Sequence, residues 1–425
     1  MECFWIQKFL KLSSLSSLYM KILQVHKFYY QKDGATNYML FLSSLLENAG
    51  HTVIPFSMKG KRNRETPFEK YFVSELNLRD TEDVSFLQKI STAKKILYNR
   101  EAKKNLQKLL LQENIDVAHL HNIYHHIGPS ILRVLKKRGI KIIMTLHDLK
   151  LLSPNYIMYH HGQIHEEDAK GWYTSCIKNK CVSDSTSQSA LLTFEMIFHH
   201  KIMKYYERYV DKFIAPSEFL LNKCVEYGWP REKFVHIPHP VDMKGEEMSY
   251  QDGEGVVYAG RISEEKGVRI LLDAAMRTPH IPYSIIGEGP ELPALHLDVK
   301  RKGMKNVTFL GFQEGGVLKK SLQKARILVL PSLCYENAPL SILEGQALGK
   351  VVLSSDTGGT KELLESEFLF KRGDSEGLAK KIDLWYNKAS TERKKLGMRM
   401  QKEVLKAHDQ NDHLKSILRL YRAKK

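Results

Sequence analysis

Short runs of apolar residues alternate with longer amphipathic stretches along nearly the whole chain. In the first half, six runs have the length and apolar content of buried strands, and the stretches between them repeat apolar residues at helical spacing. These runs span residues 21–25, 52–56, 116–120, 141–145, 212–215 and 233–237. Strands that alternate with helices favour a parallel, doubly wound sheet. We therefore predict an α/β domain for this half.

The second half repeats this plan, with predicted strands at residues 255–259, 283–286, 307–310, 327–330, 351–354 and 367–370. Two prolines and a polar stretch between the halves predict a hinge. We expect a first domain at 20–240, a linker at 241–253, a second domain at 254–400, and a final helix at 401–425 that packs back on the first domain. Two Rossmann-like domains would face each other with the carboxyl ends of their strands, so the active site is expected in the cleft between them.

Two segments depart from the strand and helix alternation. Residues 1–19 combine a broken apolar stretch with serines and have no small-residue cleavage site, which argues against a secretory signal. We interpret them as a non-native or alternative start, with a short membrane-surface anchor as the alternative. Residues 187–210 carry an apolar stripe at helical spacing, which we expect to be core rather than a membrane face. The stripe consists of Leu191, Phe194, Phe198, Ile202, Tyr205 and Tyr209.

Composition limits the class of protein. The 425 residues, 43% of them hydrophobic and 27% charged, suit a globular protein of two domains, and no run of about 18 apolar residues is present. Five cysteines are few and odd in number, which favours a reducing compartment over a disulfide framework and predicts a cytoplasmic protein. The net charge of +17 asks for an anionic partner, either nucleic acid, an acidic membrane or a phosphorylated substrate, unless it is simply solvated surface.

Two carboxylates, Glu336 and Glu344, lie on either side of a predicted helix start. The buried strand at 327–330 ends before a loop that contains Glu336, and the helix that follows, from about Pro339 to Gly349, contains Glu344. One carboxylate can accept hydrogen bonds from both hydroxyls of a vicinal diol, so two acids here could hold two sugars of one ligand. The alternative is that Glu336 complements the helix dipole and Glu344 reaches solvent.

A glycine and two cations follow the first strand of the second half. In Gly260-Arg261-Ile-Ser-Glu-Glu-Lys266-Gly267, the glycine permits close approach of a ligand, and the cations lie at a strand-to-helix turn. An arginine fork and a lysine point charge suit a diphosphate. The two cations together are therefore a stronger signal than a lone Gly-Arg pair.

Taken together, these motifs resemble the family-4 retaining glycosyltransferases of the GT-B fold. The resemblance extends from Met20 to nearly the end of the chain and is more specific in the second half. Its motifs are Gly260-Arg261 with Lys266-Gly267, Gly287-Glu-Gly289-Pro, Val307-Thr-Phe-Leu-Gly311-Phe312, Pro331-Ser332, Glu336-x7-Glu344 and Thr357-Gly358-Gly359.

The resemblance implies a role for each charged residue. Glu344 would hold the ribose of a nucleotide and Glu336 would face the hydroxyls of the donor sugar. Arg261 and Lys266 would bind the donor diphosphate and support its departing charge. His147, in Thr145-Leu-His147-Asp148 at a predicted strand end, matches the cleft histidine of the family.

The resemblance also implies backbone contacts to the donor. Amides near Asn337, Ala338 and Leu340 would cap its sugar and phosphate at a helix amino terminus. Gly260 would let the diphosphate approach, and the backbone around Gly311 and Phe312 would lie beside the base.

The first domain matches the family less closely. Its phosphate or acceptor loop would be Asp33-Gly34-Ala35-Thr36, with contacts from Gly34 and Ala35, but Asp33 stands where many members have a glycine. His121, in His119-Leu-His121-Asn122, ends a strand on the side expected to meet the acceptor.

A zinc site is the competing interpretation of the histidine and cysteine pattern. The histidines of His119-Leu-His121 and the pair Cys176-x4-Cys181, with His160, His161 and His165 nearby, could suit zinc. This cysteine spacing is not a standard pair of knuckles, and some relatives have further cysteines where this chain has Ser153, His165 and Asp168. We therefore predict no metal and no cofactor.

The predicted function is transfer of a sugar from a nucleotide-diphosphate donor to a hydroxyl acceptor, with retention and without a metal, in cell-surface polysaccharide or glycolipid synthesis. The expected partners are the nucleotide sugar, an acceptor that can be lipid-linked, and an anionic membrane at the cytoplasmic face. A nucleotide-sugar epimerase of the same fold and a basic nucleic-acid-binding protein are the alternatives. A reading helix or aromatic sheet motif for nucleic acid is missing, and Gly-x-Gly-x-x-Gly, which a dehydrogenase needs, follows neither first strand.

Overall fold

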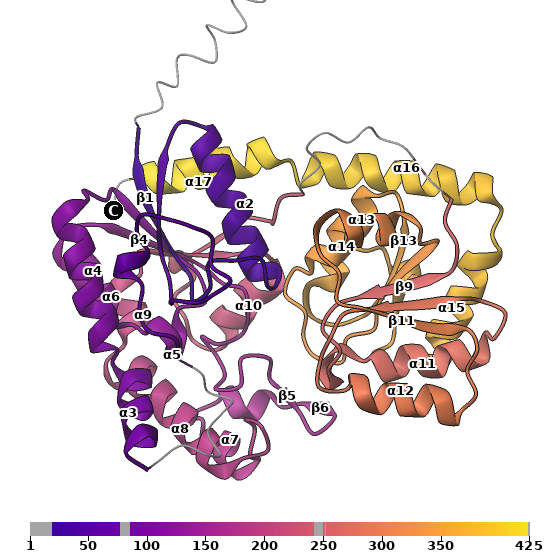
Figure 1. The fold of residues 1–425 in the computed structure, drawn as a ribbon, viewed down its shortest axis with the longest axis horizontal. Helices are drawn as coiled ribbons and strands as arrows, with labels where there is room; N and C mark the ends of the chain where they lie inside the picture. Colours follow the sequence, from indigo (N-terminus) through magenta and orange to yellow (C-terminus); the bar gives the residue numbers. More distant parts are fainter. Residues whose placement is uncertain (1–18, 77–85, 242–249, 251, 424–425) are drawn as a thin grey trace, which may run out of the picture. The chain divides into compact units, whose positions relative to one another are not determined.

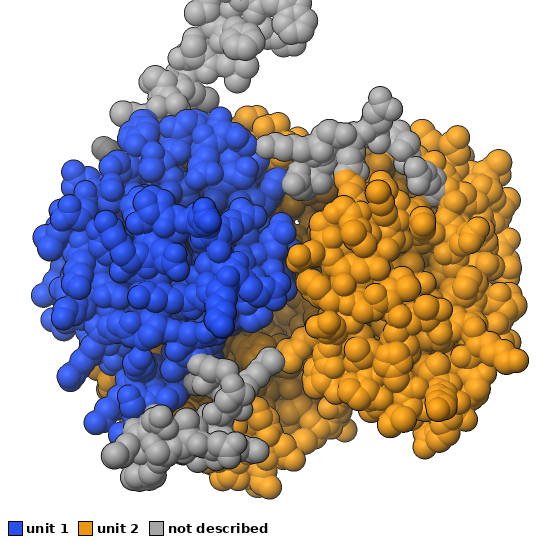
Figure 2. Space-filling view, in the orientation of Figure 1, with its two compact units in different colours: residues 1–143, 425 blue, residues 144–424 orange. Residues whose placement is uncertain are grey.

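The computed structural model describes residues 19–76, 86–241, 250 and 252–423. Its chain forms two compact units, residues 1–143 with 425 and residues 144–424, and the division falls inside a strand of the first sheet (Figure 2). The predicted start segment at 1–19, apart from Tyr19, and most of the predicted linker at 241–253 lie outside the described residues. The predicted domain limits at 240 and 254 therefore stay predictions.

The first sheet has six strands in the order β2-β1-β3-β4-β7-β8. All six were predicted to within one residue at each end. They are β1 (Lys21–Val25), β2 (Thr52–Phe56), β3 (Val117–Leu120), β4 (Lys141–Thr145), β7 (Lys212–Ala215) and β8 (Phe234–His236). Strand β1 pairs in parallel with β2 and β3, and β7 with β8. Nearly every residue of β1, β3 and β4 is buried, which explains their continuous apolar character.

Helices connect these strands, as the apolar spacing predicted. Those before β4 are α2 (Gly34–Asn48), α3 (Phe86–Leu97), α4 (Arg100–Gln112), α5 (Tyr124–Ile127) and α6 (Ser130–Lys137), and α10 (Glu218–Glu226) lies between β7 and β8. Polar N-caps start three of them: Asp33, Asn99 and Ser217 each accept a hydrogen bond from a backbone N–H in the first turn.

The second sheet has the order β11-β10-β9-β12-β13-β14, and every neighbouring pair is parallel. Its strands are β9 (Val256–Ala259), β10 (Tyr283–Ile286), β11 (Val307–Gly311), β12 (Ile327–Leu330), β13 (Val351–Ser355) and β14 (Leu369–Phe370). Numbered within this half, the order is 3-2-1-4-5-6, so the chain changes direction between β9 and β12. That switch point is where doubly wound sheets bind ligands.

Helices enclose the second sheet on both faces. Helices α11 (Val268–Arg277) and α12 (Leu292–Arg301) lie side by side on one face, and α13 (Gly315–Gln323) and α14 (Leu340–Ala347) lie on the other (Figure 1). Helix α15 (Ser375–Asn387) packs on α11, and α16 (Ser390–Ala407) packs on α14. Helix α17 (Gln410–Arg422) ends the described chain. A continuous apolar core fills the space between these helices and the strands.

Between β4 and β7 the chain forms a subdomain that the strand pattern did not reveal. Its elements are the antiparallel pair β5 (Tyr159–His160) and β6 (Gln163–Ile164), then α7 (Thr174–Lys178), α8 (Thr186–Met196), a π-helix (Ile197–Ile202) and α9 (Tyr205–Tyr209). Among the described residues, no helix has the length and apolar content needed to cross a bilayer.

The prediction that the apolar stripe of residues 187–210 is core was wrong for part of the stripe. Tyr205 is buried, but Phe194 is 50% exposed and Ile202 57% exposed. The cause is a buried ion pair, in which Lys150 Nζ lies 3.0 Å from Glu195 Oε2 and both side chains are almost fully enclosed. A buried lysine without its carboxylate would be costly, so Glu195 must point inward. Phe194, the residue before it on α8, then points toward the surface.

The prediction against disulfides was also wrong. Cys176 and Cys181 form a disulfide across a short loop, with their Cα atoms 4.9 Å apart. A pair only five residues apart can be joined by local chain geometry, which the cysteine count does not reveal. Cys224 and Cys334 are free and buried.

Candidate functional site

The predicted donor residues gather in two loops at the switch point of the second sheet. The loop after β9 holds Arg261 and Lys266, and the loop after β12 holds Glu336. Because β9 and β12 are paired neighbours in the sheet, their carboxyl ends bring these loops together. The structure thus brings together residues that are about 70 positions apart in sequence.

Lys266 and Glu336 form an ion pair at this point, with 2.7 Å between Lys266 Nζ and Glu336 Oε1. The Ser332 hydroxyl donates a second hydrogen bond to the same Glu336 oxygen. Burial acts to lower the pKa of Lys266, but the adjacent Glu336 raises it overall, so the ammonium stays charged. A cation predicted for the diphosphate and an acid predicted for the sugar therefore lie in direct contact.

Arg261 is held by its backbone and leaves its guanidinium accessible. Its carbonyl accepts a hydrogen bond of 2.6 Å from the Tyr258 hydroxyl. Its side chain is 43% exposed and lies 4.0 Å from Glu265, at the limit of an ion pair. The exposed guanidinium, which also interacts with the Tyr156 hydroxyl, can reach an anion in the solvent.

Asn337 uses its side chain to anchor the loop before α14. Its Oδ1 accepts a hydrogen bond from the Ser217 hydroxyl at 2.5 Å, and its Nδ2 donates to the Leu146 carbonyl at 3.2 Å. The side chain of Asn337 is thus engaged within the protein, and a contact of its backbone with a ligand stays a prediction. Ala338 is half-buried and Leu340 begins α14, so both lie at the helix amino terminus.

Glu344 lies inside α14 and makes no side-chain hydrogen bond or ion pair with any described residue. Its side chain is exposed, which favours an ordinary pKa, yet the protein atoms crowded around the carboxyl raise the pKa to about 7. An accessible carboxylate without a partner has both oxygens available for hydroxyl donors.

Two glycines let the site loops approach each other backbone to backbone. A Cβ on Gly358 would lie 2.0 Å from the Glu336 carbonyl oxygen, and one on Gly267 would lie 2.0 Å from the Pro331 carbonyl oxygen. Both glycines have positive φ, 60° and 67°. The N–H of Gly359 also donates to the Glu336 carbonyl at 2.8 Å. The Gly-Gly motif therefore positions Glu336 rather than a ligand.

The remaining donor residues lie at the ends of β9 and β11. Gly260 follows β9, and its N–H donates to the Ile286 carbonyl at 3.0 Å. Gly311 ends β11 with φ 70°, and Phe312 after it is 51% exposed. These positions suit a contact with a base, which stays a prediction.

His147 follows β4 and is half-buried. Its ring stacks on that of His239, with 5.8 Å between centroids. His239 is buried, which lowers its pKa well below the ordinary value and keeps its ring neutral. Its carbonyl accepts from His408 Nδ1 at 2.7 Å, and the Pro238 carbonyl accepts from His413 Nδ1 at 2.8 Å. The final helices thus support the partner of His147.

In the first unit, Asp33 occupies the amino terminus of α2 with its own side chain. Its carboxylate accepts hydrogen bonds from the backbone N–H and the hydroxyl of Thr36. Burial acts to raise the pKa of Asp33, but these bonds lower it overall. Gly34 and Ala35 are the first residues of the helix. The carboxylate therefore occupies the Thr36 amide that a phosphate would otherwise bind, and a ligand contact at Gly34 or Ala35 stays a prediction.

His121 is fully buried in the first unit. Its Nε2 lies 2.8 Å from Gln24 Oε1, and its ring stacks on that of His119 with 4.4 Å between centroids. These contacts hold the end of β3 in the core. A direct contact between His121 and an acceptor stays a prediction.

Sequence patterns missed several residues that support the loops. Ser217 was not predicted, and Ser332 was noted only as part of the Pro331-Ser332 motif without a role, because a serine in a loop carries no signal about its partner. The same holds for Glu166, whose carboxylate accepts from the Tyr335 hydroxyl at 2.6 Å and pairs with Lys223 at 2.7 Å. Within the described chain, no group of three or more histidine, cysteine or acidic side chains is arranged to hold a metal.

Family models match this chain over most of its length. The model described as "Glycosyltransferase Family 4" matches residues 32–244, which is half of the chain. The model described as "Glycosyl transferases group 1" matches residues 242–403. The chain belongs to glycosyltransferase family 4. The resemblance that the loop motifs carried is confirmed.

Known proteins agree with this family. The amylovoran biosynthesis glycosyltransferase AmsK of Erwinia amylovora is 25% identical over 239 residues, which are 49% of this chain and 58% of AmsK. The match thus spans less than two thirds of that relative. A glycosyltransferase of Rickettsia africae superposes with a TM-score of 0.65 at 19% identity, covering 95% of this chain and 98% of that one.

A second solved structure, HepE of Anabaena in complex with UDP-glucose, superposes with a TM-score of 0.64 at 17% identity. The superposition covers 95% of this chain and 99% of HepE. With the two six-stranded sheets, these likenesses confirm the predicted GT-B fold.

The close approach at Gly358 can be tested by adding a single methyl group. Gly358→Ala should destabilise the protein by roughly 2–5 kcal/mol, from the cost of positive φ and from the clash with the Glu336 carbonyl. Gly303 is a matched control, because its φ of 63° is similar and a Cβ there meets nothing within 4 Å. Gly303→Ala should cost only about 1 kcal/mol in a urea titration. Equal losses would contradict the contact.

The availability of Glu344 predicts a pH-dependent affinity for nucleotide. A nucleotide held by Glu344 should bind more tightly at about pH 8 than at about pH 6, because the carboxylate ionises through its raised pKa. Glu344→Gln should weaken binding at the higher pH by roughly 1–3 kcal/mol and remove the pH dependence. Calorimetry of both proteins across this range checks it. An unchanged affinity in Glu344→Gln would refute the ribose contact.

Proposed function

We propose that this protein transfers a sugar from a nucleoside-diphosphate donor to a hydroxyl acceptor, with retention of configuration at the anomeric carbon and without a metal. The observation that carries the proposal is the contact of Lys266 with Glu336 beside the accessible Arg261, at the switch point of the second sheet. Cations, an acid and a helix amino terminus meet there, which suits a sugar diphosphate.

The chemistry asks no side chain to form a covalent bond. The bond from the anomeric carbon to the diphosphate oxygen breaks, and its electron pair stays on the diphosphate. The acceptor hydroxyl attacks the same face, and its proton passes to a donor phosphate oxygen. Arg261 and Lys266 stabilise the leaving charge electrostatically, which is the role a metal has in other transferases. The sequence contains no Asp-x-Asp motif to hold such a metal.

Lys266 contributes more to the transition state than to the bound substrate in this scheme. Before the reaction, the negative charge of Glu336 largely compensates the positive charge of the Lys266 ammonium. As the bond breaks, negative charge grows on the diphosphate, and Lys266 interacts with it more strongly. An interaction that strengthens along the reaction lowers the barrier instead of only tightening binding. Glu336 is then free to accept hydrogen bonds from sugar hydroxyls.

Known relatives support the substrate classes. HepE of Anabaena was solved in complex with UDP-glucose, which supports a nucleotide-sugar donor for this chain. AmsK is named for amylovoran biosynthesis, which supports an acceptor in cell-surface polysaccharide synthesis. A lipid-linked acceptor on the cytoplasmic face would agree with the positive net charge.

The roles of the two cations predict the same loss of activity in two variants but a different effect on the Tm. In an assay of sugar transfer from a screened nucleotide sugar, Arg261→Ala and Lys266→Ala should each lower kcat by about 10²-fold, with a smaller effect on KM. Arg261→Ala should keep the wild-type Tm because its side chain is exposed. Lys266→Ala should lower the Tm because Glu336 loses its cation.

Three further measurements in this assay separate the alternatives. Proton NMR of the product should show the donor's anomeric configuration. Activity should survive a chelator, and its loss with recovery on adding magnesium would contradict the metal-independent mechanism. Conversion of the nucleotide sugar in the absence of any acceptor would instead identify an epimerase of the same fold.

We also propose peripheral attachment to an anionic membrane through basic residues of the first unit. Lys59, Lys61, Arg62 and Arg64 are all exposed. Each basic side chain near an anionic surface contributes about 1 kcal/mol, and salt screens it. Four together would give reversible binding that is lost at high salt.

Vesicle sedimentation checks this attachment. The protein should pellet with anionic vesicles at low salt and not with neutral ones. Replacing the four residues with glutamine should abolish pelleting, whereas a control with the same charge change on α16 should not. The control residues are Lys394, Lys395, Lys402 and Lys406, all exposed. Equal recovery in the supernatant with both vesicle types would mean that the charge is ordinary solvated surface.

A further inference from the structure

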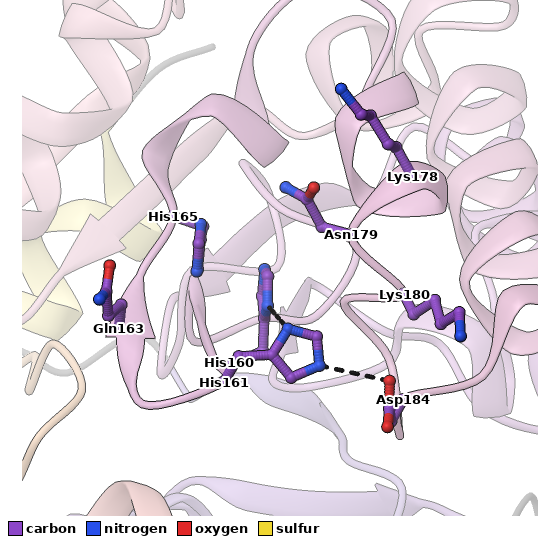
Figure 3. A pocket seen from close by; sticks show the side chains of 8 residues that line it. All are labelled: His160, His161, Gln163, His165, Lys178, Asn179, Lys180 and Asp184. Atoms are coloured by element: carbon purple, nitrogen blue, oxygen red, sulfur yellow. Dashed lines mark hydrogen bonds and ion pairs between the residues drawn. The ribbon is translucent and has the colours of Figure 1, made fainter.

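A pocket of about 450 Å³ lies within residues 160–184, and it shares no lining residue with the loops after β9 and β12. One part of its lining is His160, His161 and Gln163 of the β5–β6 hairpin, with His165 directly after it (Figure 3). Another part is Lys178, Asn179 and Lys180, which lie in the short loop closed by the Cys176–Cys181 disulfide. The donor scheme makes no use of this pocket.

The histidine side of the pocket is rigid. His160 Nε2 lies 2.7 Å from Oδ2 of Asp168, a residue with no exposed surface, and the His165 ring stacks on His160 with 3.9 Å between centroids. His165 in turn contacts Glu167 at 2.7 Å. The second Asp168 oxygen accepts a hydrogen bond from Asn179 at 3.2 Å, so the two sides of the pocket are joined through one buried carboxylate.

The opposite side carries positive charge. Lys178 and Lys180 flank Asn179 inside the disulfide loop, and both lysines are exposed. Neither forms an ion pair with a described residue. The one acid in the lining, Asp184, lies 3.3 Å from His161. The lining therefore combines two lysines with a single carboxylate.

The backbone around the pocket is unusually constrained. Eight residues other than glycine have positive φ in the described chain, and seven of them lie between 156 and 184. Three of these seven, His161, Lys180 and Asp184, line the pocket. Such conformations persist only where surrounding contacts enforce them, and they concentrate at functional sites.

We propose that this pocket binds a phosphate group, and that the Cys176–Cys181 disulfide holds Lys178 and Lys180 in place for it. Lysine ammonium groups act as point charges that suit the several oxygens of a phosphate, whereas a planar carboxylate would be better matched by arginine. The amide N–H groups of Gln163 and Asn179 can donate further hydrogen bonds to the phosphate oxygens. The phosphate comes either from the solution or from a phosphorylated lipid at the membrane.

Histidine NMR on the full-length protein gives a readout local to the pocket. The ring signals of His161 and His165, assigned with the single variants His161→Gln and His165→Gln, should shift as inorganic phosphate is added. Lys178→Gln/Lys180→Gln should weaken this response about tenfold or more. Lys170→Gln/Lys402→Gln, which removes the same charge from exposed positions outside the lining, should not weaken it.

The donor site and the source of the phosphate are separated by two further arms. Arg261→Ala should leave the histidine response intact, so the pocket result stands even if the proposed transferase activity fails. Dodecyl phosphate carried in neutral vesicles tests the lipid source. A response at much lower concentration than with inorganic phosphate identifies a lipid-borne group, and an equal response identifies free phosphate.

The disulfide is tested by reduction of the wild-type protein and by Cys176→Ser/Cys181→Ser, with circular dichroism to confirm folding. Both should weaken the response, and an unchanged response would overturn the role of the disulfide. Two outcomes would overturn the phosphate site itself. One is the absence of shifts of the His161 and His165 ring signals at millimolar phosphate. The other is an equal response of the two lysine pairs.

Discussion

The candidate site depends on how closely four loops, those after β9, β10, β12 and β13, can approach each other at the carboxyl edge of the second sheet. Gly267 and Gly358 have carbonyl oxygens where a side chain would begin, so their loops can meet only because no Cβ is present. A Cβ on Gly287 would likewise meet the Gly260 carbonyl oxygen, and one on Gly289 would meet the Ile262 carbonyl oxygen. These contacts fix the backbones of Arg261, Lys266 and Glu336 without using their side chains. The charged groups are left available for a ligand.

Charge is handled differently in two parts of the second unit. Lys150 and Glu195 are almost fully enclosed, so their pairing compensates for burial and determines which face of α8 turns inward. Lys266 and Glu336 keep some exposure, 28% and 11% of their side chains, at a sheet edge suited to ligands. An ion pair that solvent reaches can exchange its partner for an arriving anion, whereas a buried one cannot do so without a large desolvation cost. Only the second pair is therefore suited to chemistry.

The segment between β4 and β7 connects the site loops with the proposed phosphate pocket. Tyr159 donates a hydrogen bond to Glu264 at 3.1 Å, and Glu166 receives one from Tyr335, next to Glu336. The β5–β6 hairpin, which carries His160 and His161 of the pocket, begins at Tyr159 itself. A direct contact therefore links this hairpin to the loop that holds Arg261 and Lys266.

The sequence by itself determined the two sheets, because buried parallel strands must be continuous apolar runs and their boundaries follow from that requirement. It also identified the family and the loops that carry Arg261, Lys266, Glu336 and Glu344, since glycine and charge at strand ends leave a local signal. Tertiary structure alone decided the pairing of Lys266 with Glu336, the outward face of Phe194 and the burial of His121. Each of these depends on which atoms fold against which others, and a pattern along the chain carries no record of such a partner.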